Sequence, residues 1–358
     1  MKTKKNLILY ILLWPLLAAV LTVALLLVFI SVSDFRPKSI EPVKVKGDSF
    51  VIPLPADSSL TFYTWNIGYC GLGEQMDFFY EGGRRVRPSR EEYQRYRDGV
   101  IYQMTTLFNK PDFILLQEVD SLAKRSYRDN QIQRIEAGFP SYSAAFAVNY
   151  NVKFVPAPVF RPMGKVIAGQ LTLSRFRPVS AERHAYPSCY SWPKNLFMLD
   201  RCFILSRYNV SNGRQLVLIN LHNSAFNDAA DMRIQELGML KKLMKAEFDK
   251  GNYVIAGGDW NQNPLPYDSS AVSKGYDARC IHPGIPEHAL PENWQWAYDS
   301  FLPTNRDVRT PYRTGVTPVT LIDFFVLSPN IELKGVKTIE TGFRFSDHQP
   351  VGMAVGLR

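Results

Sequence analysis

Five short polar motifs are spaced along the chain, each directly after an apolar segment of strand type. They hold Asn66 in Thr64-Trp65-Asn66-Ile67-Gly68, Glu118 in Leu115-Leu116-Gln117-Glu118-Val119, His222 in Ile219-Asn220-Leu221-His222-Asn223, Asp259 with Asn261 in Gly258-Asp259-Trp260-Asn261, and Asp347 with His348 in Ser346-Asp347-His348-Gln349-Pro350. Hydrolysis of a phosphate ester needs groups that offset charge on the phosphoryl oxygens, activate water and help the alcohol leave. The motifs therefore predict a site that binds a divalent metal and attacks a phosphate ester.

Glu118 is the first candidate for a metal ligand. Its apolar approach, Phe113 to Leu116, places the carboxylate at the edge of the core, where it needs a cation or a hydrogen-bond donor. Mg²⁺ or Mn²⁺ takes oxygen ligands, and Mg²⁺ usually binds one or two protein carboxylates while it keeps several waters. Asp347 is the second candidate. The alternative for Glu118 is an ordinary role, as a helix cap or as the ion-pair partner of Arg125.

His348 is the candidate general base, because imidazole titrates near neutral pH and takes a proton from water. A base of this kind works best when a carboxylate orients its other nitrogen, and Asp323, which follows Leu321-Ile322, is the predicted partner. The alternative is an ordinary Asp-His pair at the surface.

Asp259 and Asn261 alternate around Trp260, so an extended backbone would place both side chains on one face. Together they can hold the nucleophilic water and a phosphate oxygen. His222 can donate to the phosphate or assist the leaving oxygen. The alternatives are a polar turn for Asp259 and Asn261 and a structural histidine at 222.

These residues need strands to position them, and the sequence supplies strand candidates beside a few helices. A capping box of Ser89 and Glu92 predicts one helix, and a second is predicted from near Asp228 to before Gly251. The strand candidates are 61–65, 113–116, 166–173, 202–208, 215–221, 253–256, 321–327 and 351–355. This mixture predicts an α/β architecture in layers, with the polar residues at strand ends.

The N-terminus differs in kind from the rest of the chain. Residues 1–6 form a basic segment, and residues 7–32 carry no charge, a run long enough to cross a bilayer. We expect an uncleaved transmembrane anchor rather than a signal peptide, whose apolar region is shorter. Residues 33–59 are predicted to be a linker and residues 60–358 a single catalytic domain. Large domains after one N-terminal span translocate largely regardless of flanking charge, which favours an extracytoplasmic domain.

Charge and cysteine content narrow the partners only in part. The net charge is +9, and removing Lys2, Lys4 and Lys5 leaves +6 on the rest, which suits an anionic partner such as nucleic acid or a lipid head group. The basic stretch with Arg84, Arg85, Arg87 and Arg90 is interpreted as either an exposed loop or a phosphate clamp. The four cysteines lack zinc-site spacing, and Cys189 and Cys202 are a candidate disulfide if the domain is exported.

In this order the motifs resemble the endonuclease/exonuclease/phosphatase superfamily, the deoxyribonuclease-like phosphohydrolases that include sphingomyelinases and inositol polyphosphate phosphatases. The resemblance covers about residues 60–358. It implies a four-layer α/β/β/α sandwich of two mixed sheets flanked by helices, with the site at one edge. It also implies Glu118 as metal ligand with Asn66 beside it in the site, His222 at the phosphate, Asp259 and Asn261 at the water, and Asp347 with His348 as the terminal pair supported by Asp323. One departure is Gly68, where some members carry a second acidic residue.

The leading hypothesis is a membrane-tethered, Mg²⁺- or Mn²⁺-dependent phosphodiesterase or phosphatase, expected to be a monomer. A bilayer tether makes a phospholipid or sphingolipid head group a reasonable substrate. One alternative is an extracytoplasmic endonuclease, since arginine and tyrosine contact phosphates and stack on bases. Another is a non-catalytic module that binds an anionic ligand, although the full set of polar residues argues against a decayed site.

Overall fold

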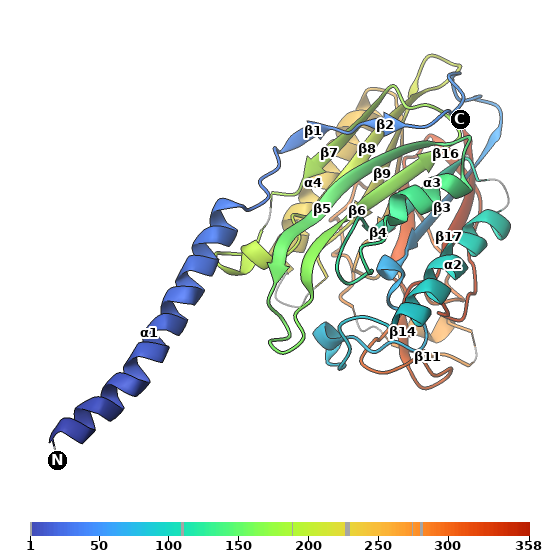
Figure 1. The fold of residues 1–358 in the computed structure, drawn as a ribbon. Coiled ribbons are helices and arrows are strands. Elements are labelled where there is room, and N and C mark those ends of the chain that lie inside the picture. Colours follow the sequence, from blue (N-terminus) through green and yellow to red (C-terminus); the bar gives the residue numbers. More distant parts are fainter. Residues whose placement is uncertain (1, 109–110, 188, 226–229, 274, 280–281) are drawn as a thin grey trace.

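The computed structural model describes residues 2–108, 111–187, 189–225, 230–273, 275–279 and 282–358. Helix α1 (Lys2–Val32) projects away from the folded part, as Figure 1 shows. Its stretch Leu13–Val32 is long and apolar enough to cross a membrane, and it is almost wholly exposed. By length and composition α1 is therefore a candidate membrane span.

Two seven-stranded sheets make up the folded part. The first sheet has the order β1 (Ile40–Pro42), β7 (Ser180–Ala185), β8 (Cys202–Asn209), β9 (Gln215–His222), β10 (Tyr253–Asp259), β15 (Asp323–Leu327) and β12 (Gln295–Ala297). The second sheet has the order β16 (Ile331–Thr338), β17 (Val351–Leu357), β3 (Ser59–Asn66), β4 (Phe113–Asp120), β6 (Gly164–Ser174), β5 (Ser143–Val155) and β2 (Val45–Lys46). Both are mixed, because β9 and β10 are parallel, as are β3 and β4, whereas their other neighbours are antiparallel.

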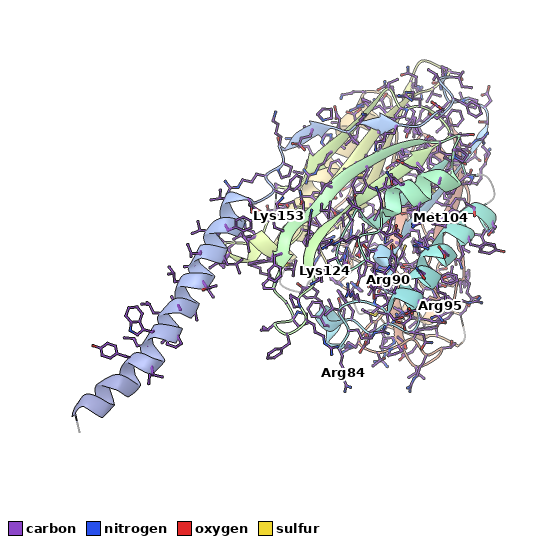
Figure 2. All side chains as sticks on the ribbon, in the orientation of Figure 1. Arg84, Arg90, Arg95, Met104, Lys124 and Lys153 are labelled. Atoms are coloured by element: carbon purple, nitrogen blue, oxygen red, sulfur yellow. The ribbon has the colours of Figure 1, made fainter. Side chains whose placement is uncertain are left out.

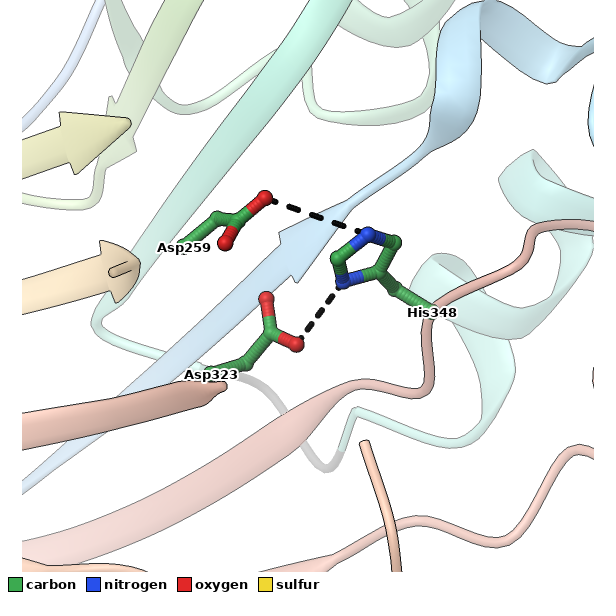
Figure 3. A group of neighbouring side chains, drawn as sticks. All are labelled: Asp259, Asp323 and His348. Carbon is green, nitrogen blue, oxygen red and sulfur yellow. Dashed lines mark hydrogen bonds and ion pairs between the residues drawn. The ribbon is translucent and has the colours of Figure 1, made fainter. Parts of the chain in front are cut away.

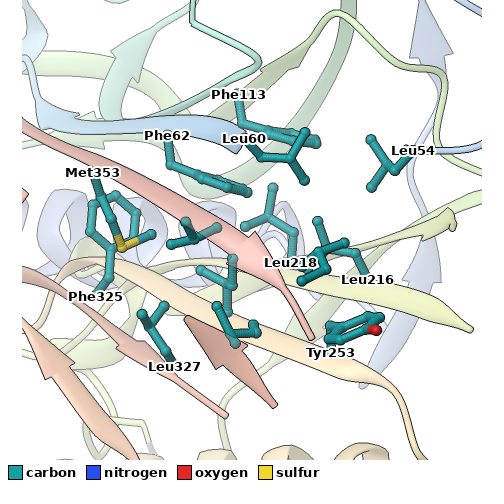
Figure 4. Packing of buried hydrophobic residues seen from close by; sticks show 14 of the residues in the cluster. Leu54, Leu60, Phe62, Phe113, Leu216, Leu218, Tyr253, Phe325, Leu327 and Met353 are labelled. Carbon is teal, nitrogen blue, oxygen red and sulfur yellow. The ribbon is translucent and has the colours of Figure 1, made fainter. Parts of the chain in front are cut away.

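Helices cover the outer faces of the two sheets. Helix α4 (Ala230–Asp249) packs on the first sheet, and α2 (Arg90–Thr106) and α3 (Gln131–Gly138) pack on the second. Between the sheets lies an apolar core, to which the second sheet contributes Leu60, Phe62 and Phe113 and the first contributes Leu216 and Leu218 (Figure 4). The predicted four-layer α/β/β/α sandwich is confirmed.

Smaller elements lie at the ends of the sandwich. A three-stranded sheet consists of β11 (Asp277–Ala278), β14 (Pro318–Thr320) and β13 (Asn305–Arg306). Short 3₁₀ helices are η1 (Gly68–Cys70), η2 (Phe79–Glu81), η3 (Lys194–Phe197) and η5 (Ser269–Ala271).

The predicted helices have the expected starts and ends where these are described. Ser89 Oγ accepts from the backbone N of Glu92, whose carboxylate accepts from the backbone N of Ser89, so the capping box opens α2. Helix α4 ends at Asp249, before Gly251, but its predicted start near Asp228 lies outside the described residues. Helix α3 and strand β5 were not among the predicted elements.

The segment 33–59, predicted to be a linker, pairs with both sheets. Its strand β1 pairs with β7 and its strand β2 pairs with β5, so it lengthens an edge of each sheet. Leu54 is completely buried in the core between the sheets. The segment therefore holds the start of the chain against the folded part.

The candidate disulfide is absent, because Cys202 is buried, Cys189 is exposed, and both are free thiols. Of the two interpretations of the basic stretch 84–90, the structure favours the exposed loop. Arg84, Arg87 and Arg90 are exposed, Arg85 pairs with Glu92, and Arg87 and Arg90 both lie over the ring of Tyr127. Figure 2 labels Arg84 and Arg90 in this region.

The inner faces of the strands change from apolar to polar along their length. On β9 the inward side chains are Leu216, Leu218, Asn220 and His222, because side chains alternate along a strand. Asn220 Oδ1 accepts from Gln117 Nε2 of the opposite sheet at 2.7 Å. This buried polar layer separates the apolar core from the strand ends, where the predicted site residues lie.

Candidate active site

Strand register brings three predicted residues into one row across the first sheet. Asp259 at the end of β10 lies opposite His222 of the parallel strand β9. On the other side, Asp259 lies opposite Asp323 of the antiparallel strand β15. Gly258 (φ 147°) allows the close approach of β9, because a Cβ there would meet Leu221 O at 2.0 Å.

Glu118 reaches the site because β4 contains a bulge. Ile114 and Leu116 face the helices α2 and α3, so regular alternation would turn Glu118 the same way. The register with β6 shifts between Leu116 and Val119, and Glu118 has a left-handed backbone (φ 55°). A bulge re-aims a side chain, and here it directs the carboxylate into the cavity described below.

Asn66 links the two sheets at the site. Its Nδ2 donates to Glu118 Oε1 at 3.2 Å and to Asp259 Oδ2 at 2.9 Å. Its Oδ1 accepts from the backbone N of Gly68 at 3.0 Å, which fixes the orientation of the amide. Asn66 therefore holds two carboxylates from different sheets at a set separation.

His348 lies between two carboxylates of the first sheet, as Figure 3 shows. Its Nδ1 is 2.8 Å from Asp323 Oδ2, and its Nε2 is 3.8 Å from Asp259 Oδ2. The predicted pairing of His348 with Asp323 is therefore present. The potential ligand atoms of Asp259, Asp323 and His348 lie within 4.8 Å of one another. We nevertheless assign no metal to this group, because the hydrogen bond between His348 Nδ1 and Asp323 indicates an imidazole oriented by a carboxylate.

The loop that carries His348 is fastened to the end of β3. Trp65 Nε1 donates to the backbone O of His348 at 2.9 Å, and Ser346 Oγ donates to the backbone O of Asn66 at 2.8 Å. Asn305 Nδ2 lies 3.0 Å from His348 Nε2. Burial opposes a charge on the imidazole, but the carboxylates of Asp323 and Asp259 outweigh it and raise the pKa of His348.

Glu118 and Asp347 fit the donor set that a hard divalent cation requires. Burial raises the pKa of Asp347 to about 6, and the charge of Glu118 adds to the rise against the opposite effect of His348. A buried carboxylate beside a second carboxylate at a cavity wall favours a cation between the two. Gly68 makes room for this arrangement, because a Cβ there would lie 2.7 Å from Asp347 Oδ1. The space of a second acidic side chain at position 68 is therefore taken by Asp347.

Asp259 and Asn261 share the site through a turn, not through the extended backbone predicted for them. Asn261 has φ 52°, and its backbone N donates to Asp259 Oδ1 at 2.9 Å. Its Nδ2 donates to the backbone O of Asn223 at 2.9 Å. Burial raises the pKa of Asp259. The turn brings both side chains to the cavity wall.

His222 is a neutral imidazole at neutral pH. Burial, reinforced by the charge of Arg201, holds its pKa well below the usual range. Its Nε2 lies 3.4 Å from Asp259 Oδ2 and 3.9 Å from Glu118 Oε1. Because Nε2 faces carboxylates, which accept hydrogen bonds, we assign the proton of the neutral ring to Nε2.

The site residues surround one cavity of about 500 Å³. Six of the eight predicted residues line it, and Asn66 and Asp323 lie behind them as supports. The alternative partner for Glu118 is excluded, because Arg125 pairs with Asp120 at 2.9 Å. The cavity lining also includes the apolar and aromatic side chains Leu72, Phe78, Tyr80, Tyr150, Met163, Met198 and Leu199, and the four arginines Arg125, Arg201, Arg306 and Arg309.

Several residues that line the cavity were not predicted from the sequence. Tyr69, whose buried hydroxyl has no hydrogen-bond partner among the described residues, lies three positions after Asn66, which was the one available signal. Arg125 stacks on its ring at 3.8 Å. Asn305, Arg201 and His282 come from irregular segments or strand starts, where spacing carries no signal.

Comparisons with known proteins agree with this geometry. The profile of the Endonuclease/Exonuclease/phosphatase family matches residues 63–348. Curated proteins give no match. The solved structures that are similar in fold include D. rerio TDP2 complexed with single strand DNA product, at 14% identity and TM-score 0.53, covering 84% of this chain and 99% of that one.

Two further solved structures have the same fold. The human Nocturnin catalytic domain with bound sulfate anion has 16% identity and TM-score 0.51, with 88% of this chain and 98% of that chain covered. The endonuclease/exonuclease/phosphatase from Beutenbergia cavernae has 15% identity and TM-score 0.51, with 84% and 72% covered.

Proposed function

The chain belongs to the endonuclease/exonuclease/phosphatase family, whose members are metal-dependent phosphoesterases and nucleases, and we propose that it is a membrane-anchored hydrolase of lipid phosphate esters. The bond is a phosphodiester or a phosphomonoester in a phospholipid or sphingolipid head group. The attacking group is a water from which a general base takes the proton. Mg²⁺ is the proposed ion, with Mn²⁺ as the other candidate.

One observation carries the proposal: a single cluster of hydrogen bonds and close ion-pair contacts joins residues from five separate motifs. Asn66 Nδ2 donates to both Glu118 and Asp259, and Asp259 lies between His222 and His348. The cluster is buried at one end of a cavity large enough for a head group. A module that only bound anions would gain little from an imidazole held between two carboxylates, so the arrangement favours an enzyme.

Each residue has a defined part in the proposed reaction. Glu118 and Asp347 would hold the metal ion, which when bound offsets charge on the phosphoryl oxygens. Asp323 fixes the ring of His348 through Nδ1 and leaves Nε2 toward the cavity, where the neutral imidazole takes the proton of the water. Because the two carboxylates raise the pKa of His348, the ring must first lose its own proton, and its neutral form is then a strong base. Asp259 and Asn261 orient that water.

The remaining polar groups act on the phosphate and on the carboxylates. His222, neutral and with its Nε2 proton toward the site, donates to a phosphate oxygen or to the leaving oxygen. Asn66 keeps Glu118 and Asp259 in place. A direct part for Asn66 in metal binding is also proposed. Its Nδ2 faces the two carboxylates and its Oδ1 faces the backbone N of Gly68, so ligation by the amide oxygen would require the amide group to turn.

The wall of the cavity supports a lipid over a nucleic acid. The lining includes methionine, leucine and aromatic side chains, which suit an acyl chain or ceramide, together with Arg201 and Arg309, which suit the phosphate of a head group. A nuclease uses a basic groove that follows a strand. The solved complex of D. rerio TDP2 with a DNA product keeps an endonuclease as the second candidate.

Helix α1 supports the anchor. It is the one membrane-span candidate found among the described residues. We propose that it stays in the mature chain and that the catalytic domain is extracytoplasmic. Protease treatment of intact cells checks this orientation: an exposed domain is digested, and an intact domain contradicts it.

Purified full-length chain in detergent micelles tests the proposed function. Sphingomyelin, phosphatidylcholine, phosphoinositides, plasmid DNA and bis(p-nitrophenyl) phosphate are assayed with Mg²⁺ and with EDTA. We expect lipid turnover that EDTA abolishes and that His348→Asn lowers by about 10²–10⁴-fold, the usual contribution of a general base.

The matched control is His288→Asn, at an exposed histidine whose left-handed backbone (φ 62°) an asparagine tolerates. This variant keeps full activity. Turnover of DNA without turnover of any lipid would replace the lipid hydrolase by the nuclease. Near-normal turnover in His348→Asn would remove His348 from the role of base.

A further inference from the structure

The hairpin between β5 and β6 ends in two apolar side chains that are almost fully in solvent. Phe160 is 97% exposed and Val159 is 82% exposed. Arg161 and Lys153 of the same hairpin are also exposed, and Figure 2 labels Lys153. An aromatic and a β-branched residue side by side at a projecting tip, next to basic residues, is the composition of a segment that enters a membrane interface.

The hairpin lies on the side of the domain from which α1 departs, as Figure 1 shows. The end of α1 is packed against the domain: Ile30 is buried, and Trp192 Nε1 donates to Ser31 Oγ at 3.4 Å. Trp192 itself remains 63% exposed, beside the end of the span where tryptophan is favoured in membrane proteins.

The segment that holds Trp192 also contacts the hairpin. Tyr150 Oη of β5 donates to the backbone O of Phe197 at 2.9 Å. The end of α1, the segment 190–199 and the hairpin are thus connected by direct contacts. A bilayer crossed by α1 therefore faces both the tryptophan and the hairpin.

The same elements line one part of the active-site cavity, which we call its mouth. Met163 and Tyr150 of the hairpin line it, as do Met198 and Leu199 of the segment 190–199. Met163 follows Phe160 by three residues. A tip inserted in the bilayer surface would place this mouth at the level of the lipid head groups.

We propose that Val159 and Phe160 enter the interfacial layer of the bilayer that α1 spans, forming a second membrane contact that turns the cavity mouth toward the lipid head groups. The occupant of this surface is a phospholipid bilayer. The conclusion that the cavity takes its substrate from that bilayer rests on the proposed function. The contact itself does not depend on catalysis.

Depth-dependent fluorescence tests the contact. The full-length chain, with Cys189 and Cys280 replaced by serine, carries Phe160→Cys labelled with an environment-sensitive dye in phosphatidylcholine/phosphatidylserine vesicles. Cys70 and Cys202 are buried and stay unlabelled. The matched control is Val179→Cys, a 55% exposed apolar position directly before the start of β7. The strand that follows α1, β1, pairs with β7 toward its other end, so α1 leaves the domain at the end of β7 opposite to position 179.

We expect a blue-shifted emission and quenching by lipid-attached quenchers at 160, with neither at 179. Equal, water-like emission at both positions overturns the proposal. So does a shift at 160 that vanishes when vesicles contain a single copy of the chain, because the tip then contacts another copy rather than lipid. A shift that requires an added protein also overturns it.

Activity distinguishes this inference from the proposed function. The double variant Val159→Asp/Phe160→Asp is expected to lose about tenfold in turnover of vesicle lipid, because two charged side chains at the tip resist burial in the bilayer surface. Its turnover of bis(p-nitrophenyl) phosphate stays at the wild-type rate. Equal loss on both substrates would show that the tip supports the site and would overturn the docking role. A wild-type chain that hydrolyses no ester defeats the proposed function alone, and the fluorescence result still decides the contact.

Discussion

The two ends of the active-site cavity are built in different ways. At the inner end, the strand ends of both sheets and the loop that carries His348 hold the polar side chains, through hydrogen bonds such as Asn66 to Glu118 and His348 to Asp323. At the mouth, the wall comes from loops, the β5–β6 hairpin and the segment 190–199, and it is mainly apolar. The difference separates two properties: the inner end sets which bond is broken, and the mouth sets how the substrate is presented.

The largest expected effect is at the inner end. Glu118→Gln removes a charge from the proposed metal site while it keeps the shape of the side chain and its contact with Asn66. Because charge stabilisation by a bound metal is worth several kcal/mol in a transition state, we expect turnover to fall about 10³-fold or more. The fall is equal for a soluble ester and for vesicle lipid.

Initial rates on both substrates, with increasing Mg²⁺, check this prediction. The control Glu287→Gln changes an exposed carboxylate and leaves both rates unchanged. A loss confined to vesicle lipid would break the comparison, because Glu118 would then act in presentation.

The next effect comes from a residue that does not line the cavity. Asp323→Asn keeps the size of the side chain but removes the carboxylate that accepts from His348 Nδ1. The imidazole then loses its fixed tautomer, and kcat is expected to fall by about 10²–10³-fold with KM nearly unchanged, a part of the contribution of a general base. A rise in KM with unchanged kcat would instead assign Asp323 to substrate binding. Steady-state kinetics on the soluble ester measure both constants.

The inner end was largely predictable from sequence because its residues follow strand signals. Strand pairing brings together His222, Asp259 and Asp323, and the apolar segments near these residues predicted the strands. The bulge that aims Glu118 was not predictable, because it depends on the register between β4 and β6. The long hairpin, the η3 segment and the pairing of β1 and β2 with sheet edges depend on contacts between distant residues, which periodicity does not encode.

A buried ion pair lies between the two ends of the cavity. Arg125 donates to Asp120 through both Nε and Nη2, and it stacks on the ring of Tyr69. Asp120→Asn leaves a buried guanidinium without its counter-charge, so we expect the free energy of unfolding to fall by about 3 kcal/mol. Urea denaturation measures this change.

The control for this variant is Asp98→Asn, which breaks an exposed pair with Arg97 and costs less than about 1 kcal/mol. The turnover of the soluble ester is then compared with the turnover of vesicle lipid. If the folded Asp120→Asn protein keeps the wild-type ratio of these two rates, the ion pair supports both ends of the cavity equally. A changed ratio would instead assign the pair to the mouth.

The smallest effect tests a region remote from both ends. Glu247 of α4 accepts from Arg207 of β8 at 2.8 and 2.9 Å and also from Lys250 and Asn252. These bonds, with that of Arg207 the largest, lower the pKa of Glu247 to about 2 from an ordinary 4.5. Because the folded state prefers the ionised form, the stabilisation is complete above about pH 4.5 and is lost as the pH falls toward about 2.

Glu247→Gln should therefore lower the free energy of unfolding by about 1–2 kcal/mol at neutral pH, and the difference from the wild type should shrink as the pH falls below about 4.5. Urea denaturation of both proteins over this pH range measures the difference, and Glu332→Gln, at a half-exposed pair with Arg358, is the control with little effect. A difference that stayed constant with pH would assign the loss to packing. Since Glu247 lies on the outer layer, both rates and their ratio stay unchanged, and a shift in that ratio would mean that the two ends of the cavity are not the separate parts inferred from their structures.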